Sequence, residues 1–115
     1  RSFISTNQEL WRGDALLSNN GLYRAAFQDD GNFVLYKWTP IWASNTQGKG
    51  GTVLLLQGDS NLVIYNDGKP LWASDTWSNQ SSQKVRLTVT DEGQLVMTRD
   101  SCIIWSAGEH SCPCK

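Results

Sequence analysis

Five side chains of complementary chemistry recur at one fixed spacing in two places of the 115-residue sequence, as Gln-x-Asp-x-Asn-x-Val-x-Tyr. A carboxylate accepts hydrogen bonds, an amide donates and accepts them, and a phenol adds a hydroxyl group. Together with an apolar isopropyl group, this set suits a pyranose, whose hydroxyl groups are polar and whose ring carbons are apolar. The positions are Gln28, Asp30, Asn32, Val34 and Tyr36 in the first copy and Gln57, Asp59, Asn61, Val63 and Tyr65 in the second.

A hairpin must bring these side chains together. In an extended chain the ends of the pattern would lie roughly 27 Å apart at about 3.3 Å per residue, too far for one monosaccharide. A short polar turn in each copy folds Gln back opposite Asn and leaves Val and Tyr on the returning strand. The alternative is that these are ordinary exposed strand residues around turn-forming Asp and Asn. Agreement at five positions in two copies favours a sugar site that needs no metal ion and no cofactor.

Three similar segments organise the chain. In each, two alternating runs flank a polar turn and a tryptophan follows, with the tryptophans about thirty residues apart. This pattern predicts three β-hairpins. We expect a single domain over 1–115, because two separate cores would each be too small to be stable. The repeats cover approximately 22–46, 52–76 and 85–107, and a cysteine-containing tail covers 108–115.

Period-two alternation gives each hairpin one purely apolar face, which we expect to form the core, and one mixed face. No segment has a sustained helical period, so the fold class is all-β. Stretches around 13–21, 47–51 and 78–82 are expected to be connecting loops. The predicted core comprises Phe27, Phe33, Leu35, Leu54, Leu56, Leu62, Ile64, Leu87, Val89, Leu95 and Met97, with Trp42, Trp72 and Trp105 packed in the common interior.

The third copy departs from the sugar-binding pattern. Thr90 is too short to replace Gln, Glu92 and Gln94 are each one methylene longer than Asp and Asn, and Thr98 cannot reach as far as Tyr. We therefore expect weak or no binding on this face. Its five positions are Thr90, Glu92, Gln94, Val96 and Thr98.

Charge and composition exclude several function classes. The formal net charge of −1 offers nothing to neutralise a run of phosphates, so nucleic acid is not an expected partner. Scattered basic residues and the lack of a long apolar stretch argue against membrane binding or insertion. The N-terminal stretch has no apolar signal core, so we expect a mature or non-classically secreted chain. The only histidine is His110 in the tail, so no catalytic relay can form in the core and we expect no enzyme.

Three cysteines lie near the C-terminus: Cys102, Cys112 and Cys114. We expect a disulfide between Cys102 and one of the two tail cysteines. A zinc site formed by the three with His110 is the weaker alternative. Asn79 begins an Asn-x-Ser sequon, which would be glycosylated only in a protein made in the secretory pathway.

Two further features have both a structural and a functional interpretation. Arg12-Gly13-Asp14 matches the integrin-recognition tripeptide, but a structural turn is the favoured reading. Trp11, Trp38 and Trp77 fall outside the repeats, where they are candidates for a subunit interface.

The repeated motif, the "IWAS" and "LWAS" closures and the N-terminal "LWRGDALLSNNG" resemble the bulb-type, snowdrop-agglutinin-like lectins, and among these the lily-type lectins of fish mucus or venom. The resemblance covers nearly the whole chain. It implies a β-prism II fold of three four-stranded antiparallel sheets around a pseudo-threefold axis. It also implies that Asp30 and Asn32 bind the axial 2-hydroxyl of mannose, Gln28 the 3-hydroxyl and Tyr36 the 4-hydroxyl, while Val34 packs on ring carbons. The second copy would act alike.

One residue departs from the family. Gly31 stands where plant members often carry a cysteine for a bridge across the repeat, so that bridge cannot form in this chain.

The resemblance leads to a function expectation: a calcium-independent lectin for mannose and high-mannose glycans, acting extracellularly in mucus or venom, in defence or agglutination. The family usually dimerises by exchanging C-terminal strands, which would place Ile103, Ile104 and Trp105 in a partner's sheet, so we expect a homodimer or homotetramer. Two alternatives stay open. One is a protein-binding toxin or integrin-type inhibitor on the same scaffold, and the other is a β-trefoil carbohydrate-binding module, which the short repeat disfavours.

Overall fold

Twelve β-strands form three four-stranded antiparallel sheets in the computed structural model, which describes residues 2–77 and 84–108. The first sheet contains β3 (Ala15–Leu17), β4 (Arg24–Phe27), β5 (Phe33–Tyr36) and β6 (Pro40–Ala43). The second contains β2 (Glu9–Trp11), β7 (Val53–Leu56), β8 (Leu62–Asn66) and β9 (Lys69–Ala73). The third contains β1 (Phe3–Ser5), β10 (Val85–Val89), β11 (Gln94–Arg99) and β12 (Cys102–Gly108).

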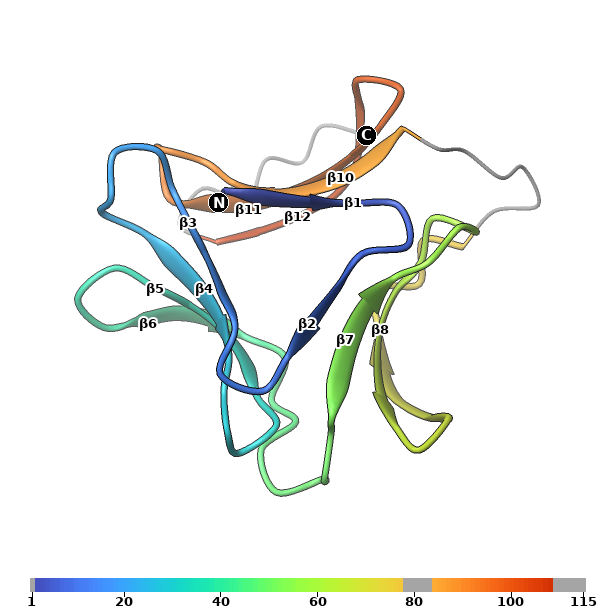
Figure 1. Cartoon of the computed structure of the whole chain (residues 1–115). Helices are drawn as coiled ribbons and strands as arrows, with labels where there is room; N and C mark the ends of the chain where they lie inside the picture. Colours follow the sequence, from blue (N-terminus) through green and yellow to red (C-terminus); the bar gives the residue numbers. More distant parts are fainter. Residues whose placement is uncertain (1, 78–83, 109–115) are drawn as a thin grey trace.

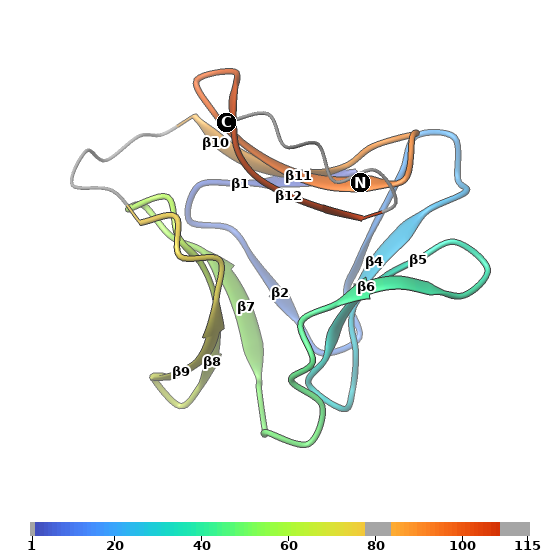
Figure 2. The same ribbon diagram turned by 180° about the vertical axis from the view of Figure 1, so that it is seen from behind.

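The three sheets face one another around a common axis and enclose the core (Figure 1). This arrangement confirms the expected all-β class and the β-prism II architecture. Strands β1, β2 and β3 lie around one end of the prism, and β6, β9 and β12 lie around the other end, which faces the viewer in Figure 2. Among the described residues there is no helix long and apolar enough to span a membrane.

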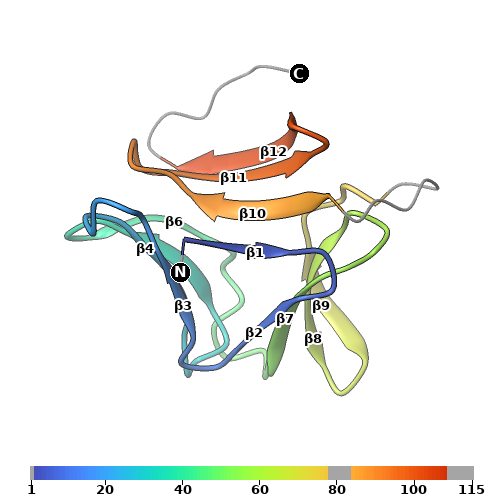
Figure 3. The same cartoon turned by 45° about the horizontal axis from the view of Figure 1, so that its top comes forward.

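The N-terminal segment gives one three-residue strand to each sheet in turn. β1 pairs with β10, β2 with β7 and β3 with β4, all antiparallel. The stretch 13–21, expected to be a connecting loop, therefore contains a strand. Each of these short strands has one fully buried side chain, Ile4, Leu10 or Leu16, which fixes its position against the core. Figure 3 shows the third sheet with its strands in the order β1, β10, β11, β12.

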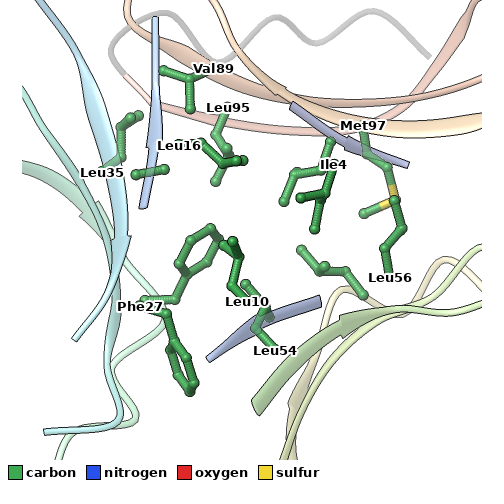
Figure 4. Packing of buried hydrophobic residues seen from close by; sticks show 14 of the residues in the cluster. Ile4, Leu10, Leu16, Phe27, Leu35, Leu54, Leu56, Val89, Leu95 and Met97 are labelled. Carbon is green, nitrogen blue, oxygen red and sulfur yellow. The ribbon is translucent and has the colours of Figure 1, made fainter. Parts of the chain in front are cut away.

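The inner faces form one hydrophobic core, as the alternation predicted. Every inner-face residue expected from the hairpins is buried, and ten core residues are labelled in Figure 4. The interior is shared among the sheets: Phe27 of the first, Leu54 of the second and Leu95 of the third all point into it. Because burying one such side chain contributes about 1.5–3 kcal/mol, the packed inner faces hold the hairpins rigidly from behind.

The three repeat tryptophans pack against one another rather than deep in the interior. Trp42, Trp72 and Trp105 form a triangle of edge-to-face contacts, with ring centroids 5.8, 5.4 and 6.1 Å apart. They are only partly buried and lie against the core cluster. The expectation that they fill the common interior was therefore wrong in position. Strands β6, β9 and β12 carry them at one end of the prism, which leaves the centre to aliphatic side chains and to Phe27 and Phe33.

The site-bearing hairpins share one backbone design. In the first, the Gly31 N–H donates to the Gln28 carbonyl at 2.9 Å, and Gly31 has a positive φ of 83° that closes the turn. The same carbonyl contact recurs in the second and third hairpins, at Ser60 and Gly93. Each sheet also has an irregularity before the last motif position, ahead of Tyr36, Tyr65 and Thr98. Such bulges re-aim the side chains beside them.

Candidate carbohydrate-binding site

The outer face of the first sheet brings the first five motif residues into one patch. Gln28 follows β4, Asp30 lies in the turn, Asn32 precedes β5, and Val34 and Tyr36 lie on β5. The Gln28 side-chain amide donates to the Tyr36 hydroxyl oxygen, so two residues eight positions apart are in contact across the hairpin. Val34 is buried beneath this polar rim. The patch thus combines polar groups with an apolar floor.

The acidic residue of this patch is fixed at the turn. One Asp30 carboxylate oxygen, Oδ1, accepts the backbone N–H of Asn32 at 3.0 Å. This contact is an Asx-type turn, which sets the direction of the carboxylate. Asp30 is exposed, so its remaining oxygen can accept a hydrogen bond from a ligand hydroxyl group.

The amide of Asn32 is held in one orientation by a buried hydroxyl network. Its Oδ1 accepts from the Ser44 hydroxyl and from the Thr46 backbone N–H, both at 3.1 Å. Thr46 donates its hydroxyl to the Gly31 carbonyl at 2.7 Å, and Ser44 accepts the Phe33 N–H at 3.1 Å. The Ser44 and Thr46 hydroxyl oxygens lie 2.9 Å apart. With Oδ1 occupied, the Asn32 amide must present its NH₂ group as a donor. We call this arrangement the asparagine clamp.

The second sheet repeats both the patch and the clamp. Gln57 donates to the Tyr65 hydroxyl oxygen, and Asp59 Oδ1 accepts the Asn61 N–H at 3.0 Å. Asn61 Oδ1 accepts from the Ser74 hydroxyl at 3.2 Å and from the Thr76 N–H at 3.3 Å. Two faces that differ in surrounding sequence therefore keep the same hydrogen bonds. The two faces thus match in their hydrogen-bond geometry as well as in their residue types.

Within residues 84–108 the third sheet shows a different set of turn contacts, although its hairpin has the same carbonyl contact as the other two. The N–H of Gln94 donates to the hydroxyl oxygen of Thr90 at 3.1 Å, where the other faces use an Asp carboxylate. Ala107 pairs with Leu95 and so occupies the strand position of Ser44 and Ser74, but it has no hydroxyl group. The third face thus differs at four of the five motif positions and also in the clamp.

Ser44, Thr46, Ser74 and Thr76 were missed as site residues by sequence reasoning. The sequence carries their signal: "WAS-x-T" closes both intact copies and changes to "WSAGE" in the third. Taken alone, this closure indicates only the repeat and the family resemblance. Its role becomes visible once β6 and β9 are placed beside β5 and β8, since the serines lie twelve or thirteen residues beyond the asparagines they orient.

Removing the clamp hydroxyl on both faces tests its role. We expect Ser44→Ala with Ser74→Ala to weaken the binding of methyl α-mannoside by about 5- to 10-fold, because each freed Asn amide can rotate and the loss of one such bond is worth about 1 kcal/mol. Isothermal titration calorimetry measures the change. Ser18→Ala is the matched control, since Ser18 is also buried, bonds to Asn20 Oδ1 at 2.7 Å and lies outside both faces. An equal affinity loss in the control would assign the effect to general destabilisation.

The Arg12-Gly13-Asp14 segment forms the turn between β2 and β3. Arg12 Nε donates to the Gly51 carbonyl at 2.6 Å, and the Asp14 carboxylate accepts the Trp11 N–H at 2.9 Å. Gly13 has a φ of 93° and donates its N–H to Phe27 at 2.8 Å. Both charged side chains of the tripeptide are thus engaged within the fold. The geometry supports the structural-turn interpretation.

Several other predictions concern surface or undescribed residues. Trp11, Trp38 and Trp77 are all exposed, Trp38 by 84%. Their assignment to a subunit interface stays a prediction. β12 pairs with β11 of its own chain. The exchange of this strand with a partner, which would move Ile103, Ile104 and Trp105, stays a prediction. Cys102 is exposed, but Asn79, His110, Cys112 and Cys114 lie outside the described residues, so the disulfide, zinc and glycosylation expectations stay untested.

Comparison with known sequences identifies clear relatives. No protein-family profile matches the chain. It is 44% identical over 110 residues to the B-type lectin plumieribetin of Scorpaena plumieri, covering 95% of this chain and 96% of that protein. It is 48% identical over 85 residues to the mannose-specific lectin of Galanthus nivalis, covering 74% of this chain and 45% of that protein.

Solved structures give the same picture. A monomeric monocot mannose-binding lectin of Gastrodia elata superposes with a TM-score of 0.87 at 32% identity, covering 96% of this chain and 99% of the other. The snowdrop (Galanthus nivalis) agglutinin in complex with methyl-α-D-mannoside superposes with a TM-score of 0.79 at 32% identity, covering 97% and 100%. These relatives are lectins, which bind carbohydrate and are not enzymes, in agreement with the expectation that this chain is not an enzyme.

Proposed function

Because this chain belongs to the bulb-type (B-type) mannose-binding lectin family, we propose that it binds D-mannose on its first and second sheets without a calcium ion and recognises high-mannose glycans. The observation that carries the proposal is the duplicated asparagine clamp beside a turn-held Asp and a Gln–Tyr pair. Each face presents fixed acceptors and donors to a hydroxylated ring. The protein groups themselves satisfy the sugar, so no metal ion is needed to bind its hydroxyl groups.

In this proposal the Asp carboxylate and the Asn NH₂ group bind the axial 2-hydroxyl group. The hydroxyl group donates to the Asp oxygen and accepts from the amide. An epimer with an equatorial 2-hydroxyl leaves both groups imperfectly paired, which is how the site discriminates. Gln and Tyr bind the 3- and 4-hydroxyl groups, and the buried Val packs on ring carbons.

Two sites on different sheets support a bridging role. The first and second sheets face outward in different directions (Figure 1), so a single chain can hold two glycans. Monosaccharide sites of this shallow kind have Kd values of about 1 mM, roughly −4 kcal/mol, and joining sites gains about 10²- to 10⁴-fold in avidity. We therefore propose agglutination or defence outside the cell, strengthened by assembly into a homodimer or homotetramer.

Retention on mannose-agarose in excess EDTA tests calcium independence. We expect retention unchanged by EDTA and elution by free methyl α-mannoside, because the site groups bind the sugar directly. Galactose-agarose is the matched control matrix and should not retain the protein. Loss of retention in EDTA, restored by added calcium, would contradict the proposal.

A further inference from the structure

The outer face of the third sheet contains a hollow of about 460 Å³ at the end of the hairpin away from its turn. It lies beside β1, the start of β10 and the turn after β11. Its polar lining comes from Ser5, Lys84, Arg86, Thr98, Asp100 and Ser101. Two cations and one carboxylate give this lining a formal charge of +1. The place corresponds to the Tyr end of the two mannose faces.

A single substitution explains why the face is hollow here. In the first sheet Arg24 pairs with Tyr36, and the Arg24 guanidinium lies 5.6 Å from the centre of the Tyr36 ring. In the third sheet Arg86 has the same register opposite Thr98. Thr98 has no ring, so the space that a phenol fills on the first sheet stays open beside Arg86. A small side chain at this motif position therefore leaves room for a ligand on the third sheet.

Arg86 is oriented by an aromatic contact from the N-terminal strand. Its guanidinium lies 4.4 Å from the centre of the Phe3 ring. A guanidinium stacked on a ring keeps its N–H donors pointing outward in its own plane, in the fork geometry that matches a carboxylate. Stacking also reduces the side-chain freedom that ligand binding would otherwise have to remove. Arg86 is thus a pre-oriented anchor for an anion.

We propose that this hollow binds a sugar that carries a carboxylate group, and so is a second kind of glycan site on the chain. Arg86 binds the carboxylate, and the Ser5, Thr98 and Ser101 hydroxyl groups face the hydroxyl groups of the ring. The formal charge of +1 suits a ligand with one negative charge. The mixture of hydroxyl groups with a single oriented guanidinium favours a sugar acid over a simple inorganic anion. This site is independent of mannose binding on the other two sheets.

NMR titration of the ¹⁵N-labelled chain tests the proposal. The probes are the methyl α-glycoside of N-acetylneuraminic acid and methyl glucuronoside, with neutral methyl galactoside and sodium sulfate as controls. We expect at least one acidic glycoside to shift the signals of Ser5, Thr98 and the Arg86 side chain at millimolar concentration. We expect this binding to persist in Asp30→Ala with Asp59→Ala, a variant that should not bind mannose.

Three variants test separately the role of the Arg86 charge, the role of the open space beside Thr98, and the effect of removing a positive charge elsewhere on the surface. Arg86→Gln should weaken binding at least 10-fold, because it removes the charged fork. Thr98→Tyr should abolish binding by filling the hollow, while unchanged signals elsewhere show that the fold persists. Lys69→Gln makes the same charge change on the second sheet and should have no effect. Equal affinity of Arg86→Gln and the unchanged chain, equal shifts with sulfate or galactoside, or no shift with either acidic glycoside would each overturn the proposal.

Discussion

Asp30→Ala combined with Asp59→Ala is expected to abolish retention on mannose-agarose while the fold persists. Each carboxylate is the charged acceptor of its face, and hydrogen bonds to charged groups contribute about 1.5–3 kcal/mol each. At a site of about −4 kcal/mol, that loss raises Kd by about 10- to 150-fold, beyond what a column retains. Each single variant keeps one intact face. We expect it to elute late from the column without being fully retained, because it loses the avidity of two sites but keeps the affinity of one.

Glu92→Ala is the matched control for this double variant. Glu92 takes the same motif position on the third sheet, so the change removes a turn carboxylate of equal charge from a face that we expect not to bind mannose. It should leave retention unchanged. Asp30→Asn with Asp59→Asn is a second control, which separates loss of the carboxylate from loss of the turn. Asn keeps a side-chain oxygen that can accept the N–H contacts at 3.0 Å that hold each turn. Full retention of the double alanine variant would show that the assigned faces are not the mannose sites.

The hairpins and the core could be predicted because their signals are local. Side chains in a strand point alternately to its two faces, so Leu54 and Leu56 point inward while their neighbours point outward. A polar turn of a few residues joins each pair of strands. The duplicated motif likewise lies within nine residues. Local folding alone places Gln28 near Tyr36, and the structure shows their side chains in contact. The roles of the site residues toward mannose stay predictions.

The remaining features depend on contacts between distant parts of the chain. β1, β2 and β3 have three residues each, too few to show a period, and each forms because one apolar side chain reaches the shared core. The asparagine clamp joins residues beside β5 and β6, and beside β8 and β9 in the second sheet. The role of its serines therefore cannot be predicted before the strands are placed in a sheet. The position of Trp42 at the end of the prism follows from packing with two other tryptophans, which alternation within one strand cannot predict.

The clamp also decides what the third face needs in order to bind mannose. Replacing only the motif, as Thr90→Gln, Glu92→Asp, Gln94→Asn and Thr98→Tyr, supplies all five side chains on an equivalent turn. The new Asn at 94 would still lack the hydroxyl group that orients its amide, because Ala107 occupies the strand position of Ser44 and Ser74. We expect this four-residue variant to bind methyl α-mannoside weakly or not at all on the third sheet.

Adding Ala107→Ser and Glu109→Thr should produce the third site. These changes restore "S-x-T" at the spacing found after Trp42 and Trp72, and Ala107 has the strand register of the two clamp serines. In an Asp30→Ala, Asp59→Ala background, where the native faces are silent, we expect mannose-agarose retention to return only with all six substitutions. Calorimetry should then give one site per chain at about 1 mM. If the four-residue variant already binds as tightly as the six-residue one, the clamp is not required for mannose recognition.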